Sequence, residues 1–187
     1  MNVSDIRKDF PILGKKIHGN DLVYFDNGAS AQKPEKVIDV IESCYRDEYS
    51  NVHRGLHYLS NNLTDKFEKA REKIQVYLGA TDSSEIIFTT GSTEALNLVA
   101  YGWGANNLRE GDEIILSVME HHSNIVPWHF LREKIGIKII WADINTKGIL
   151  EIDEVIKKIT PKTKLISVTH MSNVLGSKVD IKSLCRY

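Results

Sequence analysis

The fold is decided by the run EIILSV at residues 113–118, in which apolar residues fill most positions. Three similar short runs occur along the chain, namely EIIFTT (85–90), IKIIWADI (137–144) and KLISVTH (164–170). Helical patterns separate them, starting at Thr93, near Ile125 and at Ile152. Short apolar strands that alternate with helices are typical of a parallel sheet covered on both faces. We therefore predict an α/β fold with four strands in a partial, doubly wound, mainly parallel sheet with flanking helices.

The first third of the chain has a different pattern. It predicts a short strand at 22–25, a helix that Pro34 opens and that continues through Tyr45, and a polar stretch at 50–62. An amphipathic helix then spans 63–78 and ends at Gly79. We divide the chain into an N-terminal segment, 1–62, and an incomplete large domain, 63–187.

Composition excludes several classes of function. The 24 Lys and Arg residues balance 25 Asp and Glu residues, so we expect neither a nucleic-acid nor a membrane partner. No stretch approaches the roughly 18 apolar residues of a membrane span, and the N-terminus does not resemble a signal peptide. Cys44 and Cys185 form no Cys-x-x-Cys pair, which argues against a zinc site or a disulfide framework. We expect a cytoplasmic protein.

Polar clusters follow three of the predicted strands, at the edge where parallel sheets bind ligands. After the first strand, Gly91, Ser92 and Thr93 open a helix, whose free N–H groups and hydroxyls suit a phosphate. The same residues are equally typical of an ordinary helix cap.

The other two clusters allow similar alternatives. His121 and His122 follow the second strand, where an imidazole can stack on a flat ring and exchange protons, or simply bind a neighbouring carbonyl. Asn173 follows the fourth strand and can donate to a phenolate or carboxylate, or serve only the turn before Gly176. Three clusters at one edge with donors for a phosphate and an aromatic ring favour a ligand site.

Five segments together resemble the SufS-type (group II) cysteine desulfurases, which belong to the class V aminotransferase-like enzymes of PLP-dependent fold type I. They lie in the family's order and at similar spacing: DNGASAQKP (26–34), VHRGLH (52–57), GSTEALN (91–97), MEHHSNIVPW (119–128) and THMSNVLG (169–176). The resemblance implies conversion of L-cysteine to L-alanine, with sulfur carried as an enzyme persulfide for iron–sulfur cluster assembly. It also implies a pyridoxal 5′-phosphate (PLP) cofactor, a homodimer and a sulfur-acceptor protein of the Suf type.

The resemblance assigns the cofactor site within 63–187, the predicted PLP-binding domain. It implies that Ser92 and Thr93 hold the PLP phosphate and that His121 stacks on the pyridine ring and assists proton transfer. It places Asn173 near the O3′ side of the cofactor. In the family, the first histidine of the pair is the one that stacks.

The resemblance also assigns residues in 1–62, which it implies contribute to the active site and dimer interface. Asn27, Gly28 and Ala29 are expected to line the substrate pocket, where the family often has Ser-Ala-Ala. His53 and Arg54 are expected at the dimer interface. By spacing alone, His53 and His57 suit either a metal ion or a solvated polar loop. No third ligand is suggested nearby, and we expect no metal site.

The family's PLP-binding lysine and nucleophilic cysteine follow later strands, and no lysine or cysteine of this chain lies in a matching context. We therefore expect the chain to be the N-terminal fragment of a cysteine desulfurase, inactive by itself. The alternatives are a selenocysteine lyase or another class V PLP enzyme, and a non-catalytic remnant that acts in binding or dimerisation.

Overall fold

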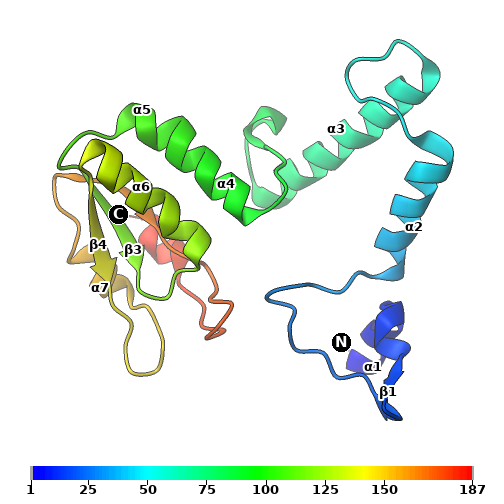
Figure 1. Ribbon diagram of the computed structural model, residues 1–187, viewed down its shortest axis with the longest axis horizontal. Coiled ribbons are helices and arrows are strands. Elements are labelled where there is room, and N and C mark those ends of the chain that lie inside the picture. The colour runs from blue at the N-terminus through cyan, green and yellow to red at the C-terminus, as the bar shows by residue number, and fades with distance from the viewer. Residues whose placement is uncertain (1, 187) are drawn as a thin grey trace. The chain divides into compact units, whose positions relative to one another are not determined.

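The computed structural model describes residues 2–186 (Figure 1). The chain forms two compact units, Met1–Phe88 and Thr89–Tyr187. The predicted boundary at 62/63 lies inside helix α3 (Tyr58–Leu78), which belongs to the first unit. The roles assigned to the two predicted segments remain predictions.

The first unit is mostly helical, with one small antiparallel hairpin. The order of its elements is α1 (Val3–Lys8), η1 (Pro11–Gly14), β1 (Lys16–Ile17), β2 (Asn20–Asp21), α2 (Glu35–Ser43), η2 (Cys44–Glu48), α3 and η3 (Ser83–Glu85). Pro34 caps α2, and Gly79 ends α3 in the left-handed conformation with φ 72°, both as the sequence predicts. Helix α3 begins at Tyr58 rather than at residue 63, so the non-helical segment predicted at 50–62 ends at residue 57.

Two predicted strands are not formed. Residues 22–25 follow the β1–β2 hairpin without a strand partner, and the Leu22 carbonyl accepts a hydrogen bond from the Arg7 side chain, 3.1 Å away. Residues 86–89 are likewise unpaired, and the Ile86 carbonyl accepts from the Arg71 guanidinium. A strand requires a neighbour for its backbone groups, which apolar content alone does not supply.

The second unit is the α/β part of the chain. Its elements are α4 (Ser92–Leu98), η4 (Val99–Gly104), α5 (Ala105–Asn107), β3 (Glu113–Ser117), η5 (His122–Asn124), α6 (Val126–Ile135), β4 (Lys138–Ala142), α7 (Ile152–Ile156), β5 (Thr163–Ser167) and α8 (Ile181–Leu184). The sheet is parallel with strand order β4-β3-β5, which confirms the predicted α/β class with three of the four predicted strands.

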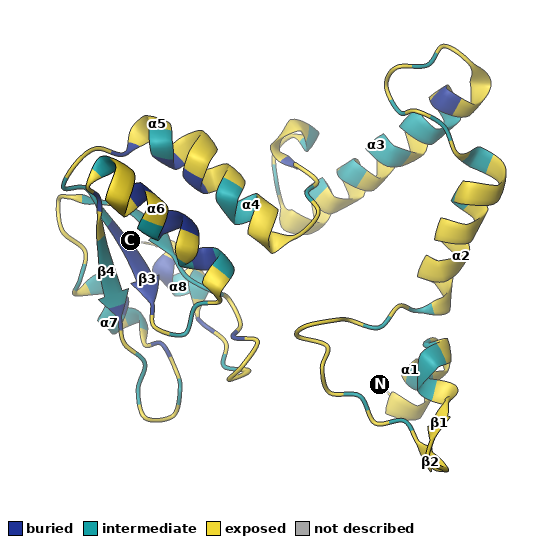
Figure 2. Ribbon diagram, in the orientation of Figure 1, coloured by how far each residue is buried: buried dark blue, intermediate teal, exposed yellow. Residues whose placement is uncertain are grey.

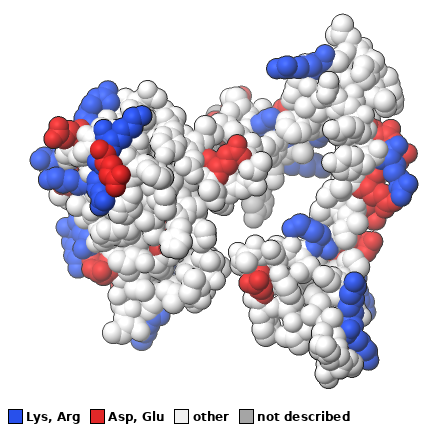
Figure 3. Space-filling view, in the orientation of Figure 1, with Lys and Arg blue, Asp and Glu red and all other residues white. Residues whose placement is uncertain are grey.

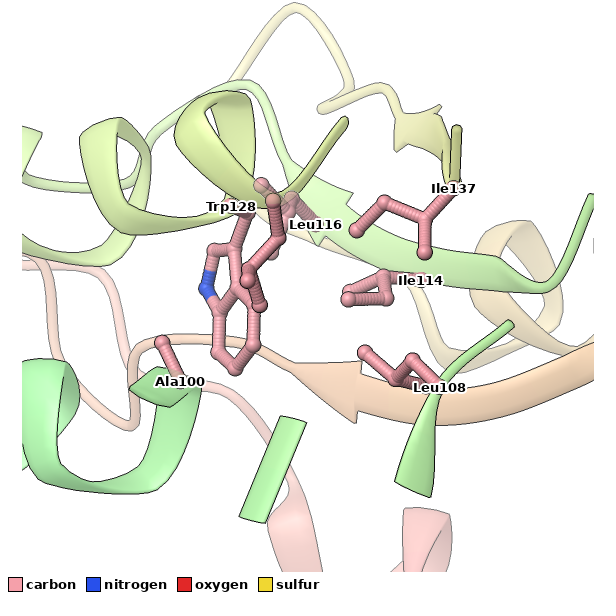
Figure 4. Packing of buried hydrophobic residues seen from close by; sticks show 7 residues of the cluster. Ala100, Leu108, Ile114, Leu116, Trp128 and Ile137 are labelled. Carbon is pink, nitrogen blue, oxygen red and sulfur yellow. The ribbon is translucent and has the colours of Figure 1, made fainter. Parts of the chain in front are cut away.

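Strand β3 is central and buried on both faces. Ile114 and Leu116 pack with Trp128 and Leu131 of α6 on one face of the sheet (Figure 4). Ile115 points to the other face and packs in a second cluster of buried residues: Ala142, Leu150, Val155 of α7, Val179 and Leu184 of α8. Alternating side chains along one strand therefore anchor two layers of helices, which is why the deciding run is apolar at consecutive positions.

The surface shows no concentration of one charge on the face seen in Figure 3, where basic and acidic side chains are interspersed. Within residues 2–186, no helix is both long and apolar enough to cross a membrane.

Candidate functional site

In the second unit, the carboxyl ends of the neighbouring strands β3 and β5 lie at the same edge of the sheet. After β3 the chain turns to α6 on one face of the sheet, and after β5 it proceeds to α8 on the other. Adjacent parallel strands whose connections leave toward opposite faces form the switch point where ligands bind in open α/β sheets. His121 and Asn173 follow these two strands, so both predicted residues belong to this edge.

The N-terminus of α4 presents Ser92 and Thr93, both exposed. Within residues 2–186 the amide N–H groups of both have no hydrogen-bond acceptor, as is usual for the first turn of a helix. Helix α4 packs beside η5, which directly follows His121. Two of the predicted cofactor-binding clusters therefore lie close together, although the segment before Gly91 is not a strand.

Glu94 supports this helix start from the first turn. Its carboxylate accepts hydrogen bonds from the Thr90 amide, 2.6 Å away, and the Thr90 hydroxyl, 2.7 Å away. The Thr90 hydroxyl, followed by the Thr90 amide, lowers the pKa of Glu94 below its ordinary value. The negative charge is also favourable near a helix N-terminus. The Glu94 carboxylate thus holds the segment before α4 through Thr90, and it does not occupy the amides of residues 92 and 93.

His121 is exposed and its ring is oriented locally. Nδ1 accepts from the Ser123 amide at 3.2 Å and lies 2.8 Å from the Ser123 hydroxyl. An accepting Nδ1 places the proton of the neutral ring on Nε2. The ring of His122 lies 6.1 Å away, tilted by 47°. Because β3 ends at Ser117, both histidines lie beyond the strand, and strand alternation does not point them to opposite faces.

Glu120, which sequence reasoning did not select, joins the two strand ends. One carboxylate oxygen accepts from the Thr169 amide, 2.8 Å away, and from the Ser117 hydroxyl. The other accepts from the side-chain amide of Asn124, 2.8 Å away. Glu120 therefore ties the segment after β3 to the segment after β5.

Asn124, also missed, is buried and extends this network. Its carbonyl oxygen accepts from Trp128 Nε1 at 3.0 Å and from the Ser167 hydroxyl at 2.7 Å, and its amide donates to the Ser167 carbonyl at 3.0 Å. In the sequence, Glu120, Asn124 and Trp128 follow one another at intervals of four residues. That spacing was the available sign that their side chains could interact.

Asn173 lies exposed in a tight turn after β5. The turn is closed by Ser172, which is buried, because its hydroxyl accepts from the amides of residues 174 and 175 and its amide donates to the Ser177 carbonyl at 3.0 Å. The Ser177 hydroxyl is 3.7 Å from the sulfur of Met119. The turn carrying Asn173 therefore contacts the segment that carries His121.

The predicted substrate residues Asn27, Gly28 and Ala29 lie in the first unit, in an exposed turn. The amides of Ala29 and Ser30 donate to the Asp26 carbonyl at 3.1 and 3.0 Å. The Tyr24 hydroxyl closes the turn by donating to the Ser30 carbonyl at 2.6 Å. The three residues thus share one defined turn.

The predicted interface residues His53 and Arg54 also lie in the first unit, and both are exposed. His53 adopts φ 64°, which is uncommon for a residue with a side chain. Its Nε2 lies 2.7 Å from Glu68, which also binds Arg71 at 2.9 Å. Arg71 and then His53 lower the pKa of Glu68. The residues that the structure describes contain no group of three or more possible metal ligands.

The loop before α3 is fastened by Ser60, which is fully buried. Its hydroxyl donates to the Asn51 carbonyl at 2.7 Å and accepts from the Gly55 amide at 3.0 Å. A Cβ atom at Gly55 would lie 2.4 Å from both Cβ and Oγ of Ser60, so the close approach requires glycine.

Comparison with known proteins gives a consistent result. The sequence profile described as "Aminotransferase class-V" matches residues 23–187. A probable cysteine desulfurase of Halalkalibacterium halodurans is 45% identical over 98% of this chain, and the chain spans 45% of that protein's length.

Solved structures agree with this result. The apo cysteine desulfurase of Thermococcus onnurineus NA1 superposes with a TM-score of 0.88 at 36% identity, over 100% of this chain and 44% of that one. A structure described as SspA in complex with cysteine gives a TM-score of 0.79 at 30% identity, over 88% of this chain and 47% of that one.

Proposed function

This chain belongs to the aminotransferase class-V family, and from that premise we propose that it is the N-terminal part of a PLP-dependent cysteine desulfurase. The proposed reaction converts L-cysteine to L-alanine and leaves the sulfur as a persulfide on an enzyme cysteine. The observation that carries the proposal is the meeting of the α4 N-terminus, His121 and the Asn173 turn at one edge of the sheet. The substrate is inferred from the names of the relatives and from the cysteine bound to SspA.

The residues present fit PLP. The open amides and hydroxyls of Ser92 and Thr93 match the acceptor oxygens of a phosphate. The exposed His121 ring supplies a flat surface and a titratable nitrogen beside them. Asn173 supplies an amide on the turn that contacts Met119. Together these groups provide an anion site, an aromatic contact and a polar donor.

Each residue then has a distinct task. PLP, when bound, supplies an electron sink for bond breaking at the substrate's Cα. Ser92 and Thr93 bind the phosphate, and Asn173 donates a hydrogen bond at the O3′ side. His121 stacks on the ring and moves a proton at Nε2, because its Nδ1 is engaged by Ser123. Asn27, Gly28 and Ala29 line the substrate pocket, while His53 and Arg54 contribute to an interface between two copies.

We extend the proposal to the SufS type, with a homodimeric, cytoplasmic enzyme that supplies iron–sulfur cluster assembly through a Suf-type acceptor. In this proposal the segment 1–62 contributes to the active site and dimer interface, and 63–187 is part of the PLP-binding domain.

The test uses the full-length protein that carries this chain. Purified with PLP and assayed with a thiol reductant, which reduces the enzyme persulfide to a thiol and free sulfide, it should form alanine and sulfide from L-cysteine in equal amounts. His121→Ala should lower turnover by about a hundredfold or more, whereas the matched His122→Ala variant should change it little. Equal losses would contradict the role of His121. Turnover of L-selenocysteine without measurable turnover of L-cysteine would replace the proposal with a selenocysteine lyase.

The phosphate site has its own test, independent of turnover. Ser92→Ala combined with Thr93→Ala should weaken PLP binding, measured by absorbance titration, relative to the control Ser83→Ala. Ser83 lies in η3 and is not among the residues that the proposal assigns to the cofactor. Unchanged PLP affinity in the double variant would show that the phosphate binds elsewhere.

A further inference from the structure

We propose that Glu120 is a positioning residue, which holds His121 in place by fastening the segment after β3 to the end of β5. The inference rests on the proposed function, because it concerns the residue that the proposal assigns to proton transfer. It is carried by the hydrogen bonds of Glu120 to Ser117, Thr169 and Asn124.

The orientation of the Asn124 side chain in this network is fixed by its partners. An indole N–H only donates, so the oxygen of the Asn124 side chain must face Trp128 Nε1, 3.0 Å away. The amide nitrogen of Asn124 therefore points the other way, toward Glu120 at 2.8 Å. That nitrogen also donates to the Ser167 carbonyl, an acceptor only. If the Asn124 side-chain amide were rotated by 180°, its nitrogen would face the Trp128 N–H and its oxygen would face the Ser167 carbonyl, and neither pair could form a hydrogen bond.

The same reasoning applies at the other carboxylate oxygen. The Thr169 backbone amide only donates, so the oxygen of Glu120 that lies 2.8 Å away must accept. Both oxygens of Glu120 therefore face hydrogen-bond donors, the Thr169 amide on one side and the Asn124 side-chain amide on the other. Glutamine has nearly the same shape, but its NH2 group would face one of these donors. Residue 120 is thus specified by its two acceptor oxygens as well as by its size.

The consequence for His121 follows from its neighbours. On one side it follows Glu120, and on the other its ring is engaged by Ser123, which precedes the buried Asn124. The Thr169 amide that Glu120 fixes lies four residues before Asn173 in the sequence. Glu120 therefore ties together the two segments that follow the paired strands and that carry two predicted cofactor contacts.

The experiment compares Glu120→Gln with Glu133→Gln in the full-length protein. Glu133 is an exposed residue of α6 and serves as the matched control. Hydrogen exchange should speed up about tenfold or more at the Thr169 amide and in residues 121–125 of Glu120→Gln, while β4 stays protected. For L-cysteine, kcat should fall about tenfold or more with KM within twofold, since displacement of a reacting group lowers turnover steeply.

A second variant covers the case in which Glu120→Gln does not fold. Ser117→Ala removes one of the three donors to Glu120 with little change of volume, and it should shift exchange and kcat in the same direction by a smaller factor. A Glu120→Gln protein with parent-like kcat, or with exchange increased equally in β4 and at Thr169, would overturn the proposal. If the parent itself does not release sulfide from L-cysteine, the proposed function fails, and the exchange pattern alone decides whether Glu120 fixes the two segments.

Discussion

The two units of the chain differ in how they bury side chains (Figure 2). In the second unit, two clusters of buried apolar residues cover both faces of β3. In the first unit, among residues 2–88, only Ser60 and Ile86 are buried. Its large apolar residues remain accessible, with Leu56 100%, Phe25 94% and Tyr77 85% exposed.

The difference shows that the units are stabilised in different ways. Burial of apolar area is the dominant favourable contribution to folding, and within residues 2–186 it is concentrated in the second unit. The first unit is held instead by local hydrogen bonds and ion pairs, such as those of Ser60 and Glu68. The site residues on the two units should therefore respond differently to mutation and to pH.

The largest effect is expected from Trp128→Ala. Trp128 is fully buried and also donates to Asn124, so the variant should lose about 3–5 kcal/mol of unfolding free energy. The control Tyr77→Ala, on the exposed face of α3, should lose far less. Urea unfolding of both variants measures the difference. Similar losses would show that burial does not distinguish the two units.

A smaller effect is expected from the same substitution made once in each unit. Ile114→Val shortens a fully buried side chain of β3 and should cost about 0.5–1.5 kcal/mol. Ile87→Val shortens a side chain that is 66% exposed and should be close to neutral. The urea midpoints of the two variants give the comparison directly. A larger loss at Ile87 would mean that the first unit contains a core after all.

The smallest effect concerns pH and the first unit. Arg71 and His53 hold the pKa of Glu68 below its value in the unfolded chain, about 4.3. Glu68 therefore contributes stability that is present above the unfolded pKa and is lost as pH falls through the folded pKa. Glu68→Gln should flatten the fall in urea midpoint as the pH drops below about 4.3 and through the lowered pKa of Glu68, whereas the control Glu72→Gln, on the same helix, should not. Equal slopes for the two variants would exclude this contribution.

The sequence predicted the second unit better than the first. EIILSV, IKIIWADI and KLISVTH became β3, β4 and β5, because strands buried on two faces have continuous apolar runs. EIIFTT has a similar apolar run but no paired neighbour among the described residues, and pairing depends on residues distant in the sequence. Local composition cannot tell these two cases apart.

The candidate site shows a similar limit. Ser92, His121 and Asn173 were selected because each stands in a recognisable local motif, and the second unit brings their segments to one edge of the sheet. Glu120 and Asn124 were not selected, because their partners Ser167 and Thr169 lie more than forty positions further along the chain. Only the parallel pairing of β3 with β5 makes them neighbours.

The close approach of Gly55 to Ser60 has an evolutionary consequence. Any side chain at position 55 would collide with Ser60, while a smaller residue at position 60 would remove the hydroxyl that joins the Asn51 carbonyl to the Gly55 amide. A substitution at either position alone is therefore expected to destabilise the loop, whichever of the two residues is changed first. We therefore expect the loop that carries His53 and Arg54 to tolerate substitution best at its outward-facing side chains and least at Gly55 and Ser60.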